Sequence, residues 1–106
     1  MPYSFTLFER LRDHLPHAPY KRMFGGVCFF VRGHIAVGVF GDGMMVRLAP
    51  HRHADLIGQS GITPLASLPN RMRGFVVIDE SLLDDDDAIE EWLDQAFAFN
   101  RELEGK

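Results

Sequence analysis

Three apolar, β-rich runs separated by turn signals occupy the middle of the chain. Residues 27–31 form a continuous β-branched and aromatic run, which favours a strand buried within a sheet. Residues 34–40 alternate bulky with small side chains, and this period of two is typical of a strand. Asp42-Gly43 is a hairpin signal, and residues 44–48 resume the apolar pattern until Pro50 ends it. The pattern therefore predicts an antiparallel meander of three strands.

Helical spacing of apolar residues predicts a helix near each end of the chain. Ser4 can cap the first helix, and Pro16 ends it, because the residue before a proline avoids the α region. Ser81 and Asp84 have the spacing of a capping box before a last helix, whose start carries the acidic run 84–87. The wide apolar stripe of this helix predicts close packing on the sheet, with Trp92 largely buried: Ile89, Trp92, Leu93, Ala96 and Leu103, flanked by Phe97 and Phe99.

Shorter patterns lie between the meander and the last helix. We expect a short second helix over residues 51–58. Two prolines and little periodicity predict an irregular segment over residues 62–70, with a weak additional strand at 62–67. Residues 71–79 contain a run of four apolar residues that predicts a fourth strong strand. The predicted fold class is α+β, in which helices at both ends pack on an antiparallel sheet of the meander and one or two later strands.

Length and composition fit a single domain that spans residues 1–106. A hydrophobic content of 46% is typical of a globular protein, and no apolar run reaches the length of about 18 residues that a membrane span needs. Charged residues interrupt the N-terminal apolar pattern, which is unlike a signal peptide. The single cysteine, Cys28, excludes an internal disulfide. We therefore expect a cytoplasmic protein.

The net charge of −4 conceals an uneven distribution along the chain. Residues 1–53 hold seven Lys and Arg against three Asp and Glu, whereas residues 54–106 hold four against twelve. Nucleic-acid binders usually carry a concentrated basic footprint. The positive charges of the first half are scattered along it, so the sequence disfavours direct nucleic-acid binding.

No group of residues has the types and spacing of a catalytic or metal site. Cys28 lies between apolar residues of a predicted strand, which indicates a buried, inert thiol. His51 and His53 are two residues apart, and no Cys or carboxylate completes a recognised ligand spacing. The acidic run 84–87 lacks the alternating ligands and the glycine of a calcium loop. We therefore expect no enzyme activity, no metal and no cofactor.

Two adjacent glycines, Gly25 and Gly26, lead into the first strand of the meander. Glycine permits backbone angles that other residues avoid and lets the backbone approach a neighbour closely. A bulge or kink is the favoured interpretation, and a ligand-facing loop is the alternative. A phosphate loop is excluded, because it needs spaced glycines and a Lys-Ser/Thr pair before a helix, whereas a strand follows here.

Several short motifs occur in the same order in a known family. The run Arg22-Met23-Phe24-Gly25-Gly26-Val27 comes first, and Gly33 follows the first strand of the meander. Asp42-Gly43 with Arg47 forms the next hairpin, and Glu91-Trp92 opens the last helix after an acidic turn. In these motifs the whole chain resembles the N-terminal domain of the TfoX/Sxy family. The resemblance implies a sandwich of helices on an antiparallel sheet, of the type found in secretion chaperones.

The resemblance also implies a class of function. Longer members of the family carry a second, helical domain and regulate natural competence, thought to act with the cyclic-AMP receptor protein at promoters. This chain ends near residue 106 without such a domain, so the competence role is not carried over. We expect a non-enzymatic regulatory or adaptor module of bacterial type that acts through protein-protein contacts. The alternatives are a small-molecule or anion-binding domain, an unrecognised enzyme and, as the weakest, direct nucleic-acid binding.

The candidate binding residues follow from the same motifs. We expect them to be Arg22, Met23, Phe24, Gly25, Gly26 and Arg47. The two arginines either pair with acidic residues of the last helix, which would be structural, or form an anion- or protein-binding patch beside the two glycines. The sequence also allows a homodimer, because a meander leaves a sheet edge that needs a partner, and strand 44–48 contains Met44 and Met45, suited to an adaptable contact.

Overall fold

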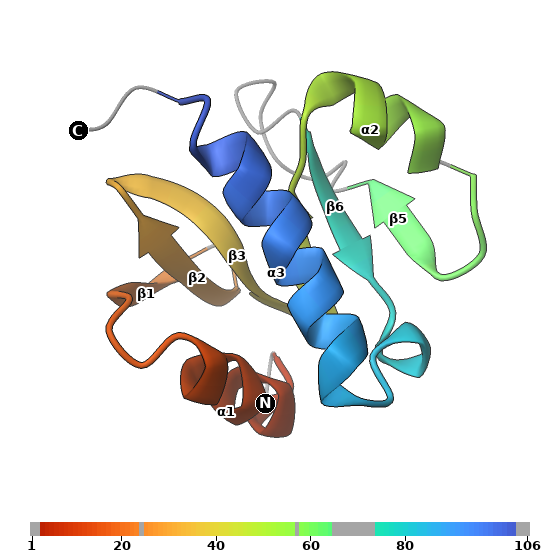
Figure 1. The fold of residues 1–106 in the computed structure, drawn as a ribbon. Coiled ribbons are helices and arrows are strands. Elements are labelled where there is room, and N and C mark those ends of the chain that lie inside the picture. Colours follow the sequence, from red (N-terminus) through yellow and green to blue (C-terminus); the bar gives the residue numbers. More distant parts are fainter. Residues whose placement is uncertain (1–2, 24, 57, 65–73, 104–106) are drawn as a thin grey trace.

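Six antiparallel strands form one sheet in the order β1-β2-β3-β4-β6-β5 (Figure 1). The computed structural model describes residues 3–23, 25–56, 58–64 and 74–103. The strands are β1 (Tyr20–Met23), β2 (Gly26–Val31), β3 (His34–Phe40), β4 (Gly43–Arg47), β5 (Ile62–Pro64) and β6 (Phe75–Ile78). The helices are α1 (Phe5–His14), α2 (Pro50–Leu56) and α3 (Asp86–Asn100), with a short 3-10 helix η2 (Glu80–Leu82) before α3. The predicted α+β fold is confirmed.

The predicted meander is present as β2, β3 and β4. The β2–β3 register pairs Val27 with Val39, and the β3–β4 register pairs Val39 with Met44. Arg32 and Gly33 join β2 to β3 with φ angles of +56° and +82°. Two consecutive positive φ angles are those of a tight two-residue hairpin turn, whose twist matches that of the strands. The predicted later strands are present too, as β6 and, within the described part of residues 62–67, as β5.

One strand, β1, was not predicted from the sequence. The segment has no apolar run and little alternation of apolar with polar residues. Its first three residues are exposed: Tyr20, Lys21 and Arg22. Antiparallel pairing with β2 holds it in place, from Tyr20 opposite Phe29 to Met23 opposite Gly26. The strand is at one end of the sheet order, and β5 is at the other. Each of these strands therefore has a neighbour on only one side.

The starts of the two long helices show one prediction confirmed and one wrong. Ser4 caps α1, because its Oγ accepts a hydrogen bond from the backbone N–H of Leu7 at 3.2 Å. A capping box of Ser81 and Asp84 does not form. The Asp79 carboxylate accepts bonds from both the N–H and the Oγ of Ser81, which places Ser81 in η2. The cap of α3 is Asp85, which accepts from the N–H of Ala88 at 2.9 Å.

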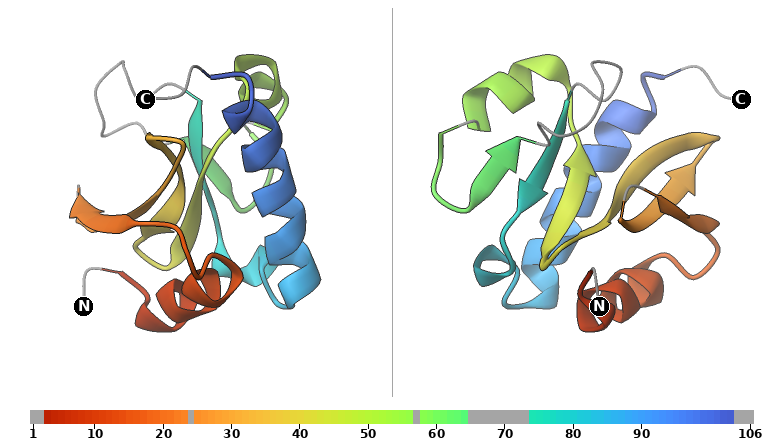
Figure 2. Two further views of the ribbon diagram at one scale, coloured as in Figure 1. Left: turned by 60° about the vertical axis from the view of Figure 1, so that its left-hand side comes forward. Right: turned by 180° about the vertical axis from the view of Figure 1, so that it is seen from behind.

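The main core lies between the sheet and the two long helices, with α3 running diagonally across the sheet (Figures 1 and 2). Its centre is fully buried, as shown by Leu11 of α1, Phe29 of β2 and Ile89 of α3, each 0% exposed. Trp92 packs against this core, as the apolar stripe of α3 predicts, but it is partly buried and lies outside the fully buried centre. Among the described residues, no helix is long and apolar enough to cross a membrane.

A second, smaller apolar cluster lies on the other face of the sheet. Its buried members are Cys28, Met45 and Phe75, and partly buried apolar residues surround them. Met44 and Met45 are 0% and 2% exposed, and β4 lies between β3 and β6. The expectation that this strand presents methionines for a contact with a second copy is therefore wrong. The strands that end the sheet are β1 and β5 instead.

Candidate functional site

The β1–β2 hairpin contains five of the six residues expected to bind a partner. Phe24 lies outside the described residues. Gly25 has a φ of +81°, which favours glycine. A Cβ atom on Gly26 would overlap the backbone oxygen of Val39 in β3, so only glycine fits there without a shift of the backbone. Both glycines thus have a structural explanation, namely a tight turn followed by close contact between strands.

The outer edge of β1 is open to a partner. The N–H of Phe30 donates to the carbonyl of Pro19 at 2.9 Å, which fixes the pairing pattern between β1 and β2. In an antiparallel ladder, hydrogen-bonded and non-hydrogen-bonded residues alternate. Lys21 and Met23 therefore bond to β2, and the N–H and C=O groups of Tyr20 and Arg22 point outward. Among the described residues, no strand pairs with the four backbone groups along this edge.

The side chains of β1 include two cations and a tyrosine ring that packs on other aromatic rings. Tyr20 is 47% exposed, and its ring packs against the rings of Phe8 and Phe29, with centroid distances of 5.1 and 5.5 Å. Lys21 and Arg22 are exposed, and neither forms an ion pair with a described residue. The edge therefore combines unpaired backbone groups with two uncompensated cations.

Arg47 does not lie beside the two glycines, because β3 and β2 separate its strand, β4, from β1. Its guanidinium lies over the rings of Phe75 and Phe99, with Cζ at 5.4 and 5.6 Å from the two centroids. No carboxylate among the described residues pairs with it, so the structural alternative of an ion pair with the last helix is replaced by two aromatic contacts. Its Nε is buried without a hydrogen-bond partner, and desolvation lowers the pKa of the guanidinium.

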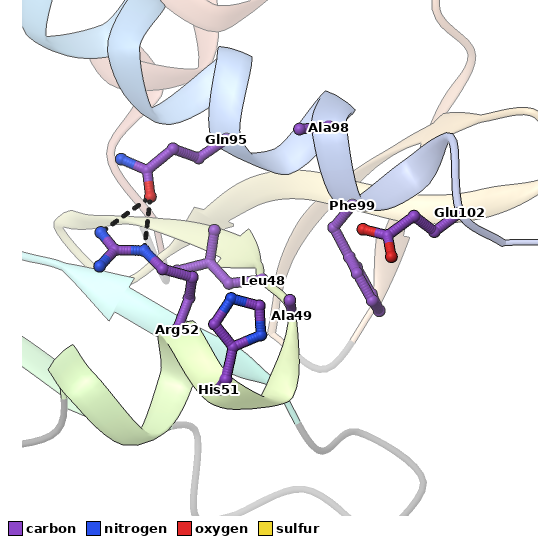
Figure 3. A pocket seen from close by; sticks show the side chains of 8 residues that line it. All are labelled: Leu48, Ala49, His51, Arg52, Gln95, Ala98, Phe99 and Glu102. Atoms are coloured by element: carbon purple, nitrogen blue, oxygen red, sulfur yellow. Dashed lines mark hydrogen bonds between the residues drawn. The ribbon is translucent and has the colours of Figure 1, made fainter.

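A pocket of about 230 Å³ lies next to Arg47, between the start of α2 and the last turns of α3 (Figure 3). Arg52 of α2 donates two hydrogen bonds to Oε1 of Gln95 in α3, at 3.3 and 3.1 Å. Phe99 contributes to this pocket and also contacts Arg47. Sequence reasoning missed the pocket, because its lining comes from two helices about forty residues apart in the chain and forms no local motif. The only sequence signal was Phe99 beside the apolar stripe of α3.

Among the described residues, neither the cysteine nor a cluster of metal-binding side chains supplies a catalytic group. Cys28 is buried, and burial raises the pKa of its thiol to about 11, so the thiolate that a nucleophile needs is scarce near neutral pH. No group of three or more His, Cys, Asp and Glu side chains in the described part of the chain is placed to hold a metal ion. The features that remain are contact surfaces and pockets.

Comparison with protein-family models gives a match over most of the chain. The model of the TfoX N-terminal domain matches residues 9–100, which is most of the chain. The matched region includes the β1–β2 hairpin, Arg47 and all of α3. Comparisons with curated proteins and with solved structures gave no match.

Proposed function

Because the chain belongs to the TfoX N-terminal domain family, we propose that it is a regulatory module that acts through protein contacts and has no enzyme activity of its own. Membership of this non-enzymatic family supports the regulatory class of function. The observation that supports action through protein contacts is the open, positively charged edge of β1. That edge also holds the hairpin with the family's most recognisable motif, which includes Arg22, Gly25 and Gly26.

An open strand edge binds extended polypeptide by adding it to the sheet. The outward N–H and C=O groups of Tyr20 and Arg22 can form four hydrogen bonds with such a segment. Main-chain bonds of this kind supply affinity, and side chains on both sides supply specificity. At the opposite edge, β5 contains Pro64, which has no N–H to donate. The geometry therefore favours β1 as the contact edge.

The charge of the edge defines the kind of partner. Lys21 and Arg22 project from opposite faces of β1, because successive side chains of a strand alternate. A partner strand with acidic residues on both faces would meet a cation on each side. Charge complementarity of this kind raises the association rate and discriminates against basic partners. We infer an extended, acidic segment of a regulatory protein as the partner.

Affinity capture from the native cell tests this with three versions of the chain. Arg22→Pro removes one outward N–H while leaving the residues that bond to β2, and prolines are tolerated at such edge positions. Arg22→Gln removes the charge alone. Arg12→Gln on α1 removes one positive charge outside β1, from a side chain that pairs with Glu9, and is the control.

We expect a partner that the unmodified chain and the Arg12→Gln variant retain and that the Arg22→Pro variant loses. Retention by the Arg22→Gln variant should weaken and depend less on salt. Equal capture by all versions would show that β1 is not the contact edge. Repeated captures that return only background would remove the support for a protein-contact function altogether.

A further inference from the structure

A second pocket, of about 430 Å³, lies on the other side of the last turns of α3. Residues 14–18, which end α1 and lead to β1, form one wall, and the tip of the β2–β3 hairpin forms another. The third wall is α3 itself, through Phe97, Asn100 and Arg101. Small-molecule sites in proteins typically have volumes of about 300–1,000 Å³ and mostly apolar walls. This pocket has that size, and apolar residues form much of its lining: Leu15, Pro16, Ala18, Val31 and Phe97.

The polar residues of this pocket are all basic or neutral. Arg32, Arg101, His14 and His17 line it, and no Asp or Glu does, although the chain as a whole has a net charge of −4. His14 has carboxylates nearby, because Asp86 and Glu90 each lie 3.7 Å from one of its ring nitrogens. Arg32 and Arg101 have no carboxylate at ion-pair distance among the described residues. An anion bound in the pocket would therefore compensate charges that no described carboxylate pairs with.

Asn100 provides an unused hydrogen-bond acceptor in the same place. The residue is only 3% exposed, and its Nδ2 donates to the carbonyl of Val31 at 3.0 Å. Its Oδ1 is buried and has no hydrogen-bond partner. Exchanging the two ends of the amide would place Oδ1 against the Val31 carbonyl, so the assignment follows from that contact. A buried acceptor without a donor carries a free-energy cost, and a small shift of the side chain that exposes Oδ1 would let a ligand with an N–H or O–H group remove this cost.

Two hydrogen bonds hold the hairpin wall against the end of α3. Arg32 has a φ of +56°, in the left-handed region that is costly for residues other than glycine. Its Nη1 donates to the carbonyl of Asn100 at 2.7 Å, and this bond, with that from Asn100 to Val31, joins the hairpin to the end of α3. The guanidinium has further N–H donors with no acceptor among the described residues. The wall is therefore formed before any ligand binds.

Basic residues at a helix C-terminus also have a structural role, because they offset the partial negative charge of the last carbonyls. That role accounts for the positions of Arg32 and Arg101. It does not account for the unpaired Oδ1 of Asn100, nor for the apolar walls that adjoin these cations. The cations, the apolar walls and the unpaired acceptor would match a ligand that has an anionic group, an apolar body and a hydrogen-bond donor.

We propose that this pocket binds a small organic acid that has an apolar body and an adjacent hydrogen-bond donor. The carboxylate meets Arg101 and the free donors of Arg32. The apolar body packs against Phe97, Val31 and Leu15, and an N–H or O–H group donates to Oδ1 of Asn100. This site is separate from the β1 edge and does not depend on a protein partner.

Three related compounds test the parts of this proposal by NMR titration of the labelled chain. N-acetyl-leucine has the carboxylate, the N–H donor and a branched apolar body. N-acetyl-leucine amide lacks the negative charge, and 4-methylpentanoate lacks the N–H donor. For N-acetyl-leucine we expect saturable shifts of the amides of Val31, Arg32, Asn100 and Arg101, with a dissociation constant of about 1 mM for a ligand of this size. We expect the amide to bind at least about tenfold more weakly and 4-methylpentanoate several-fold more weakly.

Variants of surface arginines complete the test without disturbing the fold. Arg101 is exposed and its backbone N–H bonds to the carbonyl of Phe97, so Arg101→Gln keeps the end of α3 intact. We expect this variant to bind N-acetyl-leucine about tenfold more weakly, whereas Arg12→Gln on α1 binds it normally. Absence of saturable shifts up to about 50 mM, or shifts located elsewhere, would overturn the proposal. Equal binding of acid and amide would overturn the role of the cations, and equal binding of 4-methylpentanoate would overturn the role of Asn100.

Discussion

Single residues in this chain occupy environments that restrict them in different ways. Gly26 is fixed by contact with the backbone of Val39, and Gly25 by its backbone angle alone. Arg47 has two aromatic neighbours in place of a carboxylate, although burial lowers its pKa. A sequence shows the residue type at these positions but not the neighbour. The double glycine was predicted as a bulge or kink, whereas the structure shows a tight turn at Gly25 and a close contact of Gly26 with β3. The aromatic contacts of Arg47 could not be predicted.

Replacement of the two glycines by alanine should separate these two kinds of restriction. Gly25→Ala meets open space but a positive φ, so we expect it to lower the free energy of unfolding by about 1 kcal/mol. Gly26→Ala forces β2 away from β3 and should cost more, about 2–4 kcal/mol. Chemical denaturation of both variants measures the difference. Equal losses would mean that the contact between Gly26 and Val39 relaxes without cost.

Cys28 should make the stability of the protein depend on alkaline pH. Its thiol is buried, and its pKa rises from 9.0 to about 11. Below pH 9 the thiol is protonated in both states, whereas between pH 9 and 11 the unfolded chain loses the proton and the folded chain keeps it. The free energy of unfolding therefore falls as the pH rises through this window, by at most about 3 kcal/mol.

Comparison with Cys28→Ala isolates this contribution, because the two proteins share every other side chain. Denaturation at pH 8 and at pH 11 should show a steeper loss of stability for the unmodified chain than for Cys28→Ala. Parallel losses would indicate that the thiol becomes solvated before it ionises.

At the scale of elements, strong apolar periodicity was enough to predict the meander, both long helices and β6. The strand β1 could not be predicted, because an edge strand with exposed Tyr20, Lys21 and Arg22 carries little apolar signal. Its position depends on β2, which pairs with it. The start of α3 was misplaced for a related reason, since six residues near it have side chains that can cap a helix: Asp79, Ser81, Asp84, Asp85, Asp86 and Asp87. The bond between Asp79 and Ser81 leaves Asp85 as the cap.

The acidic run before α3 offers a matched test of this assignment. Asp85→Ala should lower the free energy of unfolding by about 1 kcal/mol, because it removes the acceptor for the N–H of Ala88. Asp84→Ala, one residue earlier and exposed, should change it by less than about 0.5 kcal/mol. Thermal unfolding of the two variants near neutral pH distinguishes them. A larger loss for Asp84→Ala would mean that the helix begins earlier than the hydrogen bonds indicate.

At the scale of the whole molecule, acidic and basic residues that are unevenly distributed along the sequence lie on different parts of the surface. The exposed side of α3 carries five acidic residues, Asp86, Asp87, Glu90, Glu91 and Asp94, whereas the edge of β1 carries Lys21 and Arg22. The uneven charge could be read from the sequence. The positive charge on a strand edge could not, because that edge exists only in a strand the sequence did not predict. This edge is also where a second copy of the chain could pair.

A homodimer remains a prediction, and the structure gives it a specific dependence on salt. If two copies pair through β1, the outward groups of Tyr20 in one copy bond to those of Arg22 in the other, and Lys21 of one copy lies directly opposite Lys21 of the other. Like charges directly opposite on paired strands are destabilising. Salt screens this repulsion, so we expect light scattering to give a mass of 12.0 kDa at about 0.05 M salt and a larger mass at about 1 M.

Arg22→Pro should remain at 12.0 kDa under both conditions, because it removes an outward N–H on which the pairing depends. A dimer that weakens as salt is added would instead join the basic edge of one copy to the acidic face of α3 in the other.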